Sequence, residues 1–261
     1  MNSKQDYIAV FDSGVGGISV LRQLRRYLPS ERYLYFGDAA NAPYGTRPTA
    51  EVRQLVARAV EKLVPRGLKA LAVACNTATA AAIDLLRETY PDLIIVGIEP
   101  ALKPAADRFP GGTVGVLATP VTLREEKFAA QARKYADRCR IVKLPAPGLM
   151  ELVEAGKANS PASEALLRQL LGPWIGKLDG LVLGCTHYPF AVPTLRSILG
   201  PAVPLFDGGA GMARETRRRL ARADLLAEGG PGELILESSA DDPAEIRLCR
   251  ELLEQEMEDG R

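Results

Sequence analysis

Two cysteines stand out because the segments that carry them resemble each other. Residues 68–77 read LKALAVACNT, and residues 178–187 read LDGLVLGCTH. Each segment is an apolar run typical of a buried strand, followed by a cysteine and by residues that can open a helix. A cysteine at a helix start lies at the positive end of the helix dipole, which favours the thiolate. Cys75 and Cys185 are therefore candidate acid/base groups.

The residues that follow these cysteines are suited to binding a small acid. Asn76, Thr77 and Thr186 supply hydrogen-bonding side chains, and the unpaired N–H groups of a helix start bind carboxylates well. Two thiols on opposite sides of one carbon suggest a two-base proton exchange. One thiolate removes a proton and the other thiol supplies one to the opposite face, which inverts a stereocentre.

Elements that position these residues follow a regular alternation of strands and helices. Apolar runs that end at glycine-rich or polar turns predict strands, and apolar positions at helical spacing predict the helices between them. Predicted strands cover residues 7–11, 32–36, 68–74, 93–98, 113–117, 140–144, 180–184, 203–206 and 233–237. Predicted helices cover residues 18–28, 49–64, 76–90, 121–135, 149–171 in short pieces, a segment after 189, 212–224 and the end of the chain.

This alternation indicates an α/β fold with doubly wound parallel sheets. The repeated cysteine segment indicates two similar lobes that face a shared cleft, each giving it one cysteine. We expect the first lobe to comprise residues 1–98 plus 208–261, and the second to comprise 99–207. Ligands of such sheets bind beyond the carboxyl ends of the strands, where Asp12-Ser13 and Tyr44-Gly45 are also predicted to lie.

Composition narrows the class of protein. The 261 residues are 47% hydrophobic and 25% charged, as in ordinary globular domains, and the formal net charge of +1 gives no general reason to bind nucleic acid. No run approaches the roughly 20 apolar residues of a membrane span, and we expect no secretory signal. The four cysteines form no CxxC pair, and the single histidine argues against a histidine metal site. A cytoplasmic location fits best.

Six separate segments carry a family resemblance. They are DSGVGG from Asp12, PYG from Pro43, ACNTA from Ala74, LATPVT from Leu117, LVE from Leu152 and GCTHYP from Gly184. In this order they resemble the glutamate racemases, and the match runs from about residue 7 to residue 224.

The resemblance implies an isomerase that interconverts L- and D-glutamate without pyridoxal phosphate, flavin or metal, and that supplies D-glutamate for bacterial peptidoglycan and so for the cell wall and cell shape. It implies that Cys75 faces the proton of the D-isomer and Cys185 that of the L-isomer. We expect a homodimer. The substrate-binding residues that the resemblance implies are Asp12, Ser13, Tyr44, Gly45, Asn76, Thr77, Thr186 and His187, with Glu154 and Thr119 as supporting residues. Asp12 would hold the ammonium group and tune Cys75, and His187 with Glu154 would tune Cys185.

Other interpretations of these residues remain open. The glycines after Asp12 could cradle a phosphate, although their spacing is not that of a dinucleotide loop. Cys185 and His187 could form a hydrolase nucleophile and base, but residues two apart on a turn are expected to meet poorly, and that scheme leaves Cys75 unexplained. Asp12 could merely cap its loop, and Glu154 could lie on a helix surface.

Two rival functions also fit the sequence. One is a racemase for a related acid such as aspartate, and the other is a binding protein for small acids without catalysis. The acidic C-terminal tail, including residues 238–243, is assigned no function.

Overall fold

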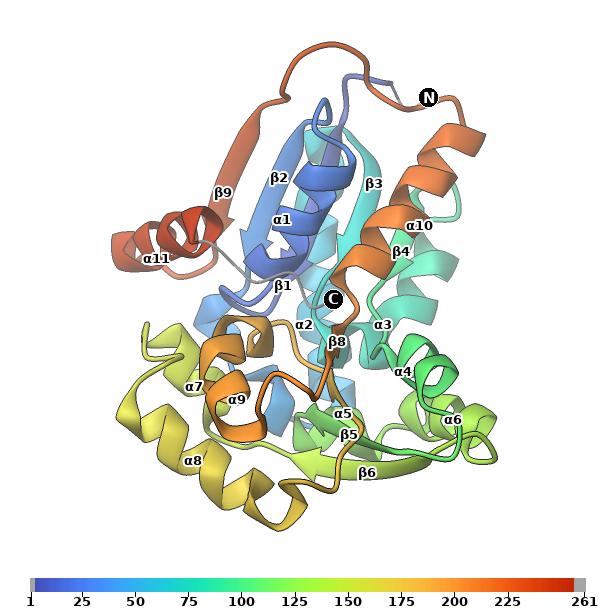
Figure 1. Ribbon diagram of the computed structural model, residues 1–261. Coiled ribbons are helices and arrows are strands. Elements are labelled where there is room, and N and C mark those ends of the chain that lie inside the picture. The colour runs from blue at the N-terminus through green and yellow to red at the C-terminus, as the bar shows by residue number, and fades with distance from the viewer. Residues whose placement is uncertain (1–2, 256–261) are drawn as a thin grey trace. The chain divides into compact units, whose positions relative to one another are not determined.

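The computed structural model describes residues 3–255, which divide into two compact units (Figure 1). One unit contains residues 3–98 with Gly209–Glu254, and the other contains Glu99–Gly208. The predicted first lobe ends at residue 261, and its residues 256–261 lie outside the described part of the chain. No helix within residues 3–255 has the length and apolar content needed to cross a membrane.

The first unit is built on a five-stranded parallel sheet with the strand order β4-β3-β1-β2-β9. Its elements are β1 (Tyr7–Asp12), α1 (Ile18–Tyr27), β2 (Tyr33–Gly37), α2 (Thr49–Leu63), β3 (Leu68–Val73), α3 (Asn76–Thr89), β4 (Ile94–Gly97), α10 (Gly209–Arg222), β9 (Leu234–Ser238) and α11 (Pro243–Glu254), with the short 3-10 turns η1 (Ala39–Asn41), η2 (Tyr44–Thr46) and η3 (Val64–Arg66).

Helices cover both faces of this sheet. Phe11, Leu71 and Val73 face the apolar stripes of α2 and α3 in one continuous core cluster. The other face is covered by α1 and α10 (Figure 1). Burial on both sides explains why β1 and β3 are mostly apolar rather than alternating, with Asp12 and Lys69 as the charged exceptions, since a parallel sheet hides both of its faces.

The second unit repeats this plan with four parallel strands in the order β6-β5-β7-β8. Leu117 and Leu183 pack against α7, α8 and α9 on one face, and Val116 and Val182 pack against α4, α5 and α6 on the other. Its elements are α4 (Leu102–Arg108), β5 (Thr113–Ala118), α5 (Pro120–Arg124), α6 (Glu126–Tyr135), β6 (Arg140–Pro145), α7 (Leu149–Glu154), α8 (Pro161–Leu171), β7 (Gly180–Leu183), α9 (Val192–Leu199) and β8 (Leu205–Asp207), with 3-10 turns η4 (Gly172–Trp174) and η5 (Tyr188–Ala191).

The two sheets share one topology. Read from its other edge, the second order is β8-β7-β5-β6, which matches β4-β3-β1-β2 strand for strand. The repeated segments predicted from the sequence are therefore β3 and β7, equivalent strands of two similar lobes. This confirms the predicted class of two doubly wound parallel-sheet lobes, and β9 is the strand that the first sheet adds.

The structure differs from the predicted helices at two places. The continuous helix expected over 121–135 is interrupted at Glu125, whose extended backbone (φ −64°, ψ 141°) separates α5 from α6. Helix α4 was not predicted from the sequence, and it contains Pro104. Pro104 lies in the first turn, where its missing N–H would have had no partner within the helix.

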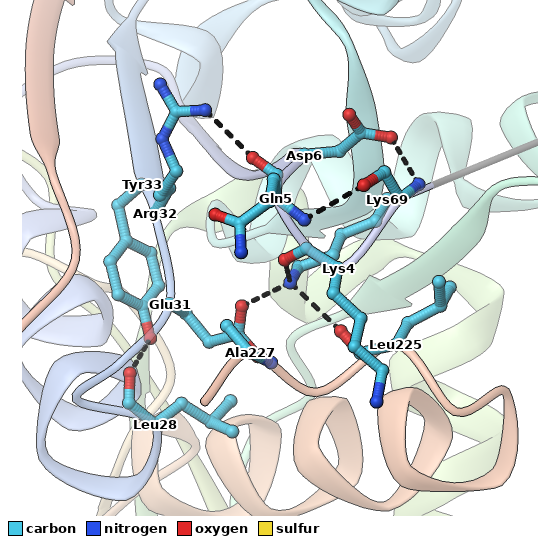
Figure 2. A network of polar contacts seen from close by, with 11 residues as sticks. Lys4, Gln5, Asp6, Leu28, Glu31, Arg32, Tyr33, Lys69, Leu225 and Ala227 are labelled. Carbon is cyan, nitrogen blue, oxygen red and sulfur yellow. Dashed lines mark hydrogen bonds and ion pairs between the residues drawn. The ribbon is translucent and has the colours of Figure 1, made fainter. Parts of the chain in front are cut away.

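A buried ion pair connects several segments of the first unit near the amino ends of its strands (Figure 2). Lys69 at the start of β3 pairs with Glu31, and both side chains are almost fully buried. Lys69 Nζ also donates to the carbonyl oxygens of Lys4 (2.6 Å) and Leu225 (2.9 Å), while Glu31 Oε1 accepts from the N–H of Ala227 (2.9 Å). These contacts fasten the N-terminal segment and the α10–β9 connection to the sheet, at the end opposite to Cys75.

Candidate functional site

Cys75 occupies the N-cap position of α3. It is buried, and its Sγ accepts a hydrogen bond from the backbone N–H of Ala78 (3.4 Å). This is the position at which an oxygen-bearing side chain usually satisfies an unpaired helix donor. A thiolate satisfies that donor better than a thiol, and it also meets the positive end of a 14-residue helix. The geometry predicted for Cys75 is therefore present.

The loop after β1 lies beside this thiol. Ser13 Oγ is 3.5 Å from Cys75 Sγ, within hydrogen-bonding range for sulfur. Asp12 is fully buried at the last position of β1, and its Oδ1 accepts from the N–H of Gly14 (3.1 Å), so the loop-capping role considered for Asp12 is real. In the sheet, β2 lies on the outer side of β1, and β4 lies on the outer side of β3, so the strand order reverses between β1 and β3. Parallel sheets of this kind bind ligands at the carboxyl ends of the two strands where the order reverses.

Asn76 and Thr77 form the first turn of α3, and both are buried. Among the atoms of residues 3–255, Asn76 Oδ1 is buried with no hydrogen-bond partner. A buried acceptor without a partner is costly, and such groups in native proteins call for an explanation. A donor on a bound molecule, such as an ammonium group, would supply one.

Tyr44 and Gly45 belong to η2, where Tyr44 is buried against Phe11 and Gly45 is half-buried. The Tyr44 hydroxyl donates to Oδ2 of Asp38 (2.5 Å). Burial, the Asp38 hydrogen bond and the nearby charges of Asp38, Cys75 and Asp12 raise the pKa of Tyr44, which keeps this phenol neutral and a donor.

Asp38 is a site residue that sequence reasoning missed. It is buried directly after β2, and it accepts from Tyr44 and from Asn41 Nδ2 (3.0 and 3.2 Å). Its N–H donates to the carbonyl of Asp12 (2.9 Å). The sequence around Asp38 indicates a turn, and its position after a buried strand was the available signal.

Cys185, His187 and Glu154 form a connected group in the second unit. Cys185 Sγ is 3.6 Å from His187 Nδ1, and His187 Nε2 is 2.5 Å from Glu154 Oε1 at the end of α7. The expectation that residues two apart on this turn would meet poorly is wrong. His187 has helical backbone angles (φ −75°, ψ −31°) just before the 3-10 turn η5, and its imidazole lies beside the thiol. Glu154 is not a bystander on a helix surface.

His187 is buried and strongly perturbed. Burial is the largest influence and acts to lower the pKa of His187, but hydrogen bonds to Cys185 and Glu154 and their negative charges together raise that pKa well above its ordinary value. The two partners of His187, a carboxylate and a sulfur, therefore favour the imidazolium form of its ring. An imidazolium beside a thiol stabilises the thiolate.

Two threonines were also singled out in this unit. Thr186 is buried between Cys185 and His187. Thr119 caps α5, since its Oγ1 accepts from the N–H of Thr122 (3.2 Å) and donates to the Thr122 hydroxyl (3.0 Å). The structure therefore gives Thr119 a capping role at the carboxyl end of β5, next to the strand that leads to Cys185.

Each unit thus presents a polarised thiol at the carboxyl end of an equivalent strand. Cys75 lies at the start of a helix, and Cys185 lies beside the ring of His187. The other two cysteines, Cys139 and Cys249, are buried away from these strand ends. Across residues 3–255, no group of three or more His, Cys, Asp and Glu side chains has an arrangement that could hold a metal ion.

Comparison with known proteins places this arrangement in a family. The model of the family described as Asp/Glu/Hydantoin racemase matches residues 13–216. The chain is 48% identical over 228 residues to the glutamate racemase of Ectopseudomonas mendocina (87% of each chain), and 43% identical over 249 residues to that of Clostridium perfringens (95% of this chain and 96% of the other).

Solved structures agree with this result. The glutamate racemase of Francisella tularensis in complex with D-glutamate matches with a TM-score of 0.84 at 28% identity, covering 97% of this chain and 96% of that one. The Escherichia coli glutamate racemase, in complex with L-glutamate and the activator UDP-MurNAc-ala, matches with a TM-score of 0.79 at 34% identity, covering 95% and 92%.

Proposed function

Because the chain belongs to the Asp/Glu/Hydantoin racemase family, we propose that it interconverts L- and D-glutamate with Cys75 and Cys185 as paired acid/base groups. The observation that carries the proposal is the duplicated thiol. The equivalent strands β3 and β7 are each followed, two residues on, by a cysteine, which contacts a helix-start N–H in one unit and an imidazole in the other. Relatives more than 40% identical over nearly the whole chain are glutamate racemases, which favours glutamate over other acids.

The proposed reaction moves one proton off the α-carbon and another onto its opposite face. From L-glutamate, the Cys185 thiolate takes the α-proton, and the electron pair of the C–H bond stays on the substrate as a carbanion. The Cys75 thiol then gives its proton to the other face and becomes a thiolate. The reverse reaction begins at Cys75. Each turnover leaves the two thiols in exchanged protonation states, so no oxidant, reductant or cofactor takes part.

The α-proton of an amino acid is a very weak acid, so the site must stabilise the carbanion electrostatically. The His187 imidazolium and the N-terminus of α3 are the positive groups available for this. We propose that the Asp12 carboxylate and the side-chain Oδ1 of Asn76 receive the substrate ammonium group. The N–H groups and hydroxyls of Ser13, Thr77 and Thr186, with the backbone N–H groups of Tyr44 and Gly45, would receive the carboxylates.

Heavy water tests the proposal directly. L-Glutamate incubated with the protein in heavy water should gain deuterium at the α-carbon while its optical rotation falls to zero. Aspartate, run in parallel, reports whether the site accepts a shorter acid. Binding of glutamate without α-deuteration would mean a binding protein and would contradict the proposal. The absorption spectrum of the purified protein should lack the visible band of a pyridoxal Schiff base.

We propose a role for this activity in the cell as well. The protein would act in the cytoplasm as a homodimer and supply D-glutamate for peptidoglycan. Expression in a bacterial strain that requires added D-glutamate should remove that requirement, whereas a Cys75→Ser variant should not. Sedimentation of the purified protein tests the dimer.

A further inference from the structure

The turn between β9 and α11 is fastened to the loop that carries Asp38. The N–H of Ser239 donates to the carbonyl of Gly37 (2.9 Å), and Ser239 Oγ accepts from the N–H of Ala40 (3.0 Å). These two bonds lie on either side of Asp38 along the chain. Ser239 therefore spans the segment from which the buried Asp38 carboxylate reaches Tyr44.

The turn is itself held in shape. Ser238 Oγ donates to Oε2 of Glu245 on α11 (2.6 Å) and accepts from the N–H of Ala240 (3.0 Å). Ser238 is also the register partner of Gly37 across β2 and β9. A methyl group on Gly37 would lie 2.8 Å from the carbonyl oxygen of Gly14 and 3.2 Å from Glu245 Oε1, so the turn, the Asp38 loop and the loop after Asp12 are closely packed.

We propose that Ser238 and Ser239 are positioning residues, which hold the Asp38–Tyr44 pair so that η2 keeps the geometry needed to bind substrate. The inference rests on the proposed function, because it assigns η2 to substrate binding. It gives the C-terminal β9–α11 segment, to which the sequence assigned no function, a part in that site. Neither serine touches substrate in this scheme, and both act through the backbone of the loop from Gly37 to Ala40.

A serine elsewhere provides a matched control. Ser30 Oγ donates to the carbonyl of Gly229 (2.8 Å), which fastens the same C-terminal region to the body of the unit. That contact lies at the amino ends of the strands, away from Asp38. Ser30→Ala therefore removes an exposed serine contact of similar strength without touching the Asp38 loop. Ser239→Thr keeps the hydroxyl and serves as the conservative variant.

The test combines steady-state kinetics with amide hydrogen exchange. The double variant Ser238→Ala/Ser239→Ala removes three side-chain hydrogen bonds, of which the Ser239–Ala40 bond reaches the Asp38 loop. It should raise the KM for glutamate about two- to tenfold and change kcat less. Amides of residues 38–46 should exchange faster in this variant. Ser239→Thr should keep the wild-type KM, and Ser30→Ala should leave both KM and exchange in that loop unchanged.

The outcomes separate the inference from the proposed function. If the wild-type protein racemises glutamate but the double variant keeps its KM, or Ser30→Ala raises KM equally, the positioning role is wrong. If the wild-type protein does not act on glutamate, the proposed function fails. Amide exchange alone then tests whether Ser238 and Ser239 hold the Asp38 loop, and unchanged exchange over residues 38–46 in the double variant would overturn that role.

Discussion

Replacing Glu154 with glutamine should lower the pKa of His187. The carboxylate lies 2.5 Å from His187 Nε2, and the two side chains are 21% and 2% exposed, so solvent screens this pair weakly. Glutamine keeps the shape and a hydrogen-bonding oxygen but removes the negative charge. Burial, which is the largest influence on His187 and favours the neutral ring, would then be opposed mainly by Cys185.

The size of the effect follows from the geometry. An opposite charge within hydrogen-bonding distance commonly shifts a pKa by about one to three units. One unit corresponds to about 1.4 kcal/mol, so the variant should lose roughly 1.4 to 4 kcal/mol of preference for the imidazolium. Since the imidazolium is what stabilises the Cys185 thiolate in our scheme, removal of the α-proton from L-glutamate should slow at neutral pH.

Nuclear magnetic resonance can follow this titration without ambiguity, because the chain has a single histidine. The wild-type imidazole should titrate above about pH 6.5, and the Glu154→Gln imidazole at least one unit lower than the wild type. Glu151→Gln is the matched control, since Glu151 is an exposed carboxylate on the same helix and does not contribute to the pKa shift of His187. An unshifted wild-type midpoint, or equal midpoints in wild type and Glu154→Gln, would refute the reasoning.

The same shift links stability to pH. Because folding raises the pKa of His187, its stabilising contribution is complete below the unfolded value near pH 6.5 and is lost as the pH rises through the folded value. The free energy of unfolding of wild type should therefore exceed that of Glu154→Gln most clearly near about pH 6, and the gap should narrow as the pH rises. A gap that widens toward alkaline pH would contradict this.

Three further variants test separate parts of the structure. Lys69→Met leaves Glu31 buried without its counter-charge and should lower the free energy of unfolding, measured in urea, by about 3–5 kcal/mol. The double variant Lys69→Met/Glu31→Gln should recover much of this loss, and equal losses in the two variants would contradict the ion pair's role. Gly184→Ala places a methyl group 2.9 Å from Ala118 Cβ and should lower the free energy of unfolding by about 1–3 kcal/mol. It should also lower the rate of racemisation, measured by polarimetry, and unchanged activity would mean that Cys185 tolerates a displaced strand end. Tyr44→Phe removes a hydrogen bond to the buried Asp38 carboxylate. Hydrogen bonds to charged groups contribute about 1.5–3 kcal/mol, so the KM for glutamate should rise about tenfold or more. An unchanged KM would mean that Tyr44 does not help to bind substrate.

The features predictable from the sequence were those with a repeating or local pattern. The similar segments around Cys75 and Cys185 predicted equivalent strand ends. In the structure the two cysteines follow β3 and β7, which are equivalent strands of the two sheets. Apolar runs located the strands because both faces of a parallel sheet are buried. The cap position of Cys75 follows from the strand–helix boundary alone.

Other features depend on tertiary neighbours and left little trace in the sequence. Asp38 looked like a turn residue, and its partner Tyr44 becomes visible only when η2 folds back against β2. Ser239 meets Ala40 across a distance of 199 residues in the chain. The contact of His187 with Cys185 depends on the backbone turn that leads into η5, which residue spacing alone does not specify.

Proton exchange in single-cysteine variants tests the two-thiol mechanism most directly. In heavy water, Cys185→Ser should incorporate α-deuterium into D-glutamate through Cys75 while leaving L-glutamate unlabelled, and Cys75→Ser should do the reverse. Neither variant should racemise at more than a small fraction of the wild-type rate. Labelling of both isomers by either variant, or near-normal racemisation without one of the thiols, would contradict the assignment of one cysteine to each face of the substrate.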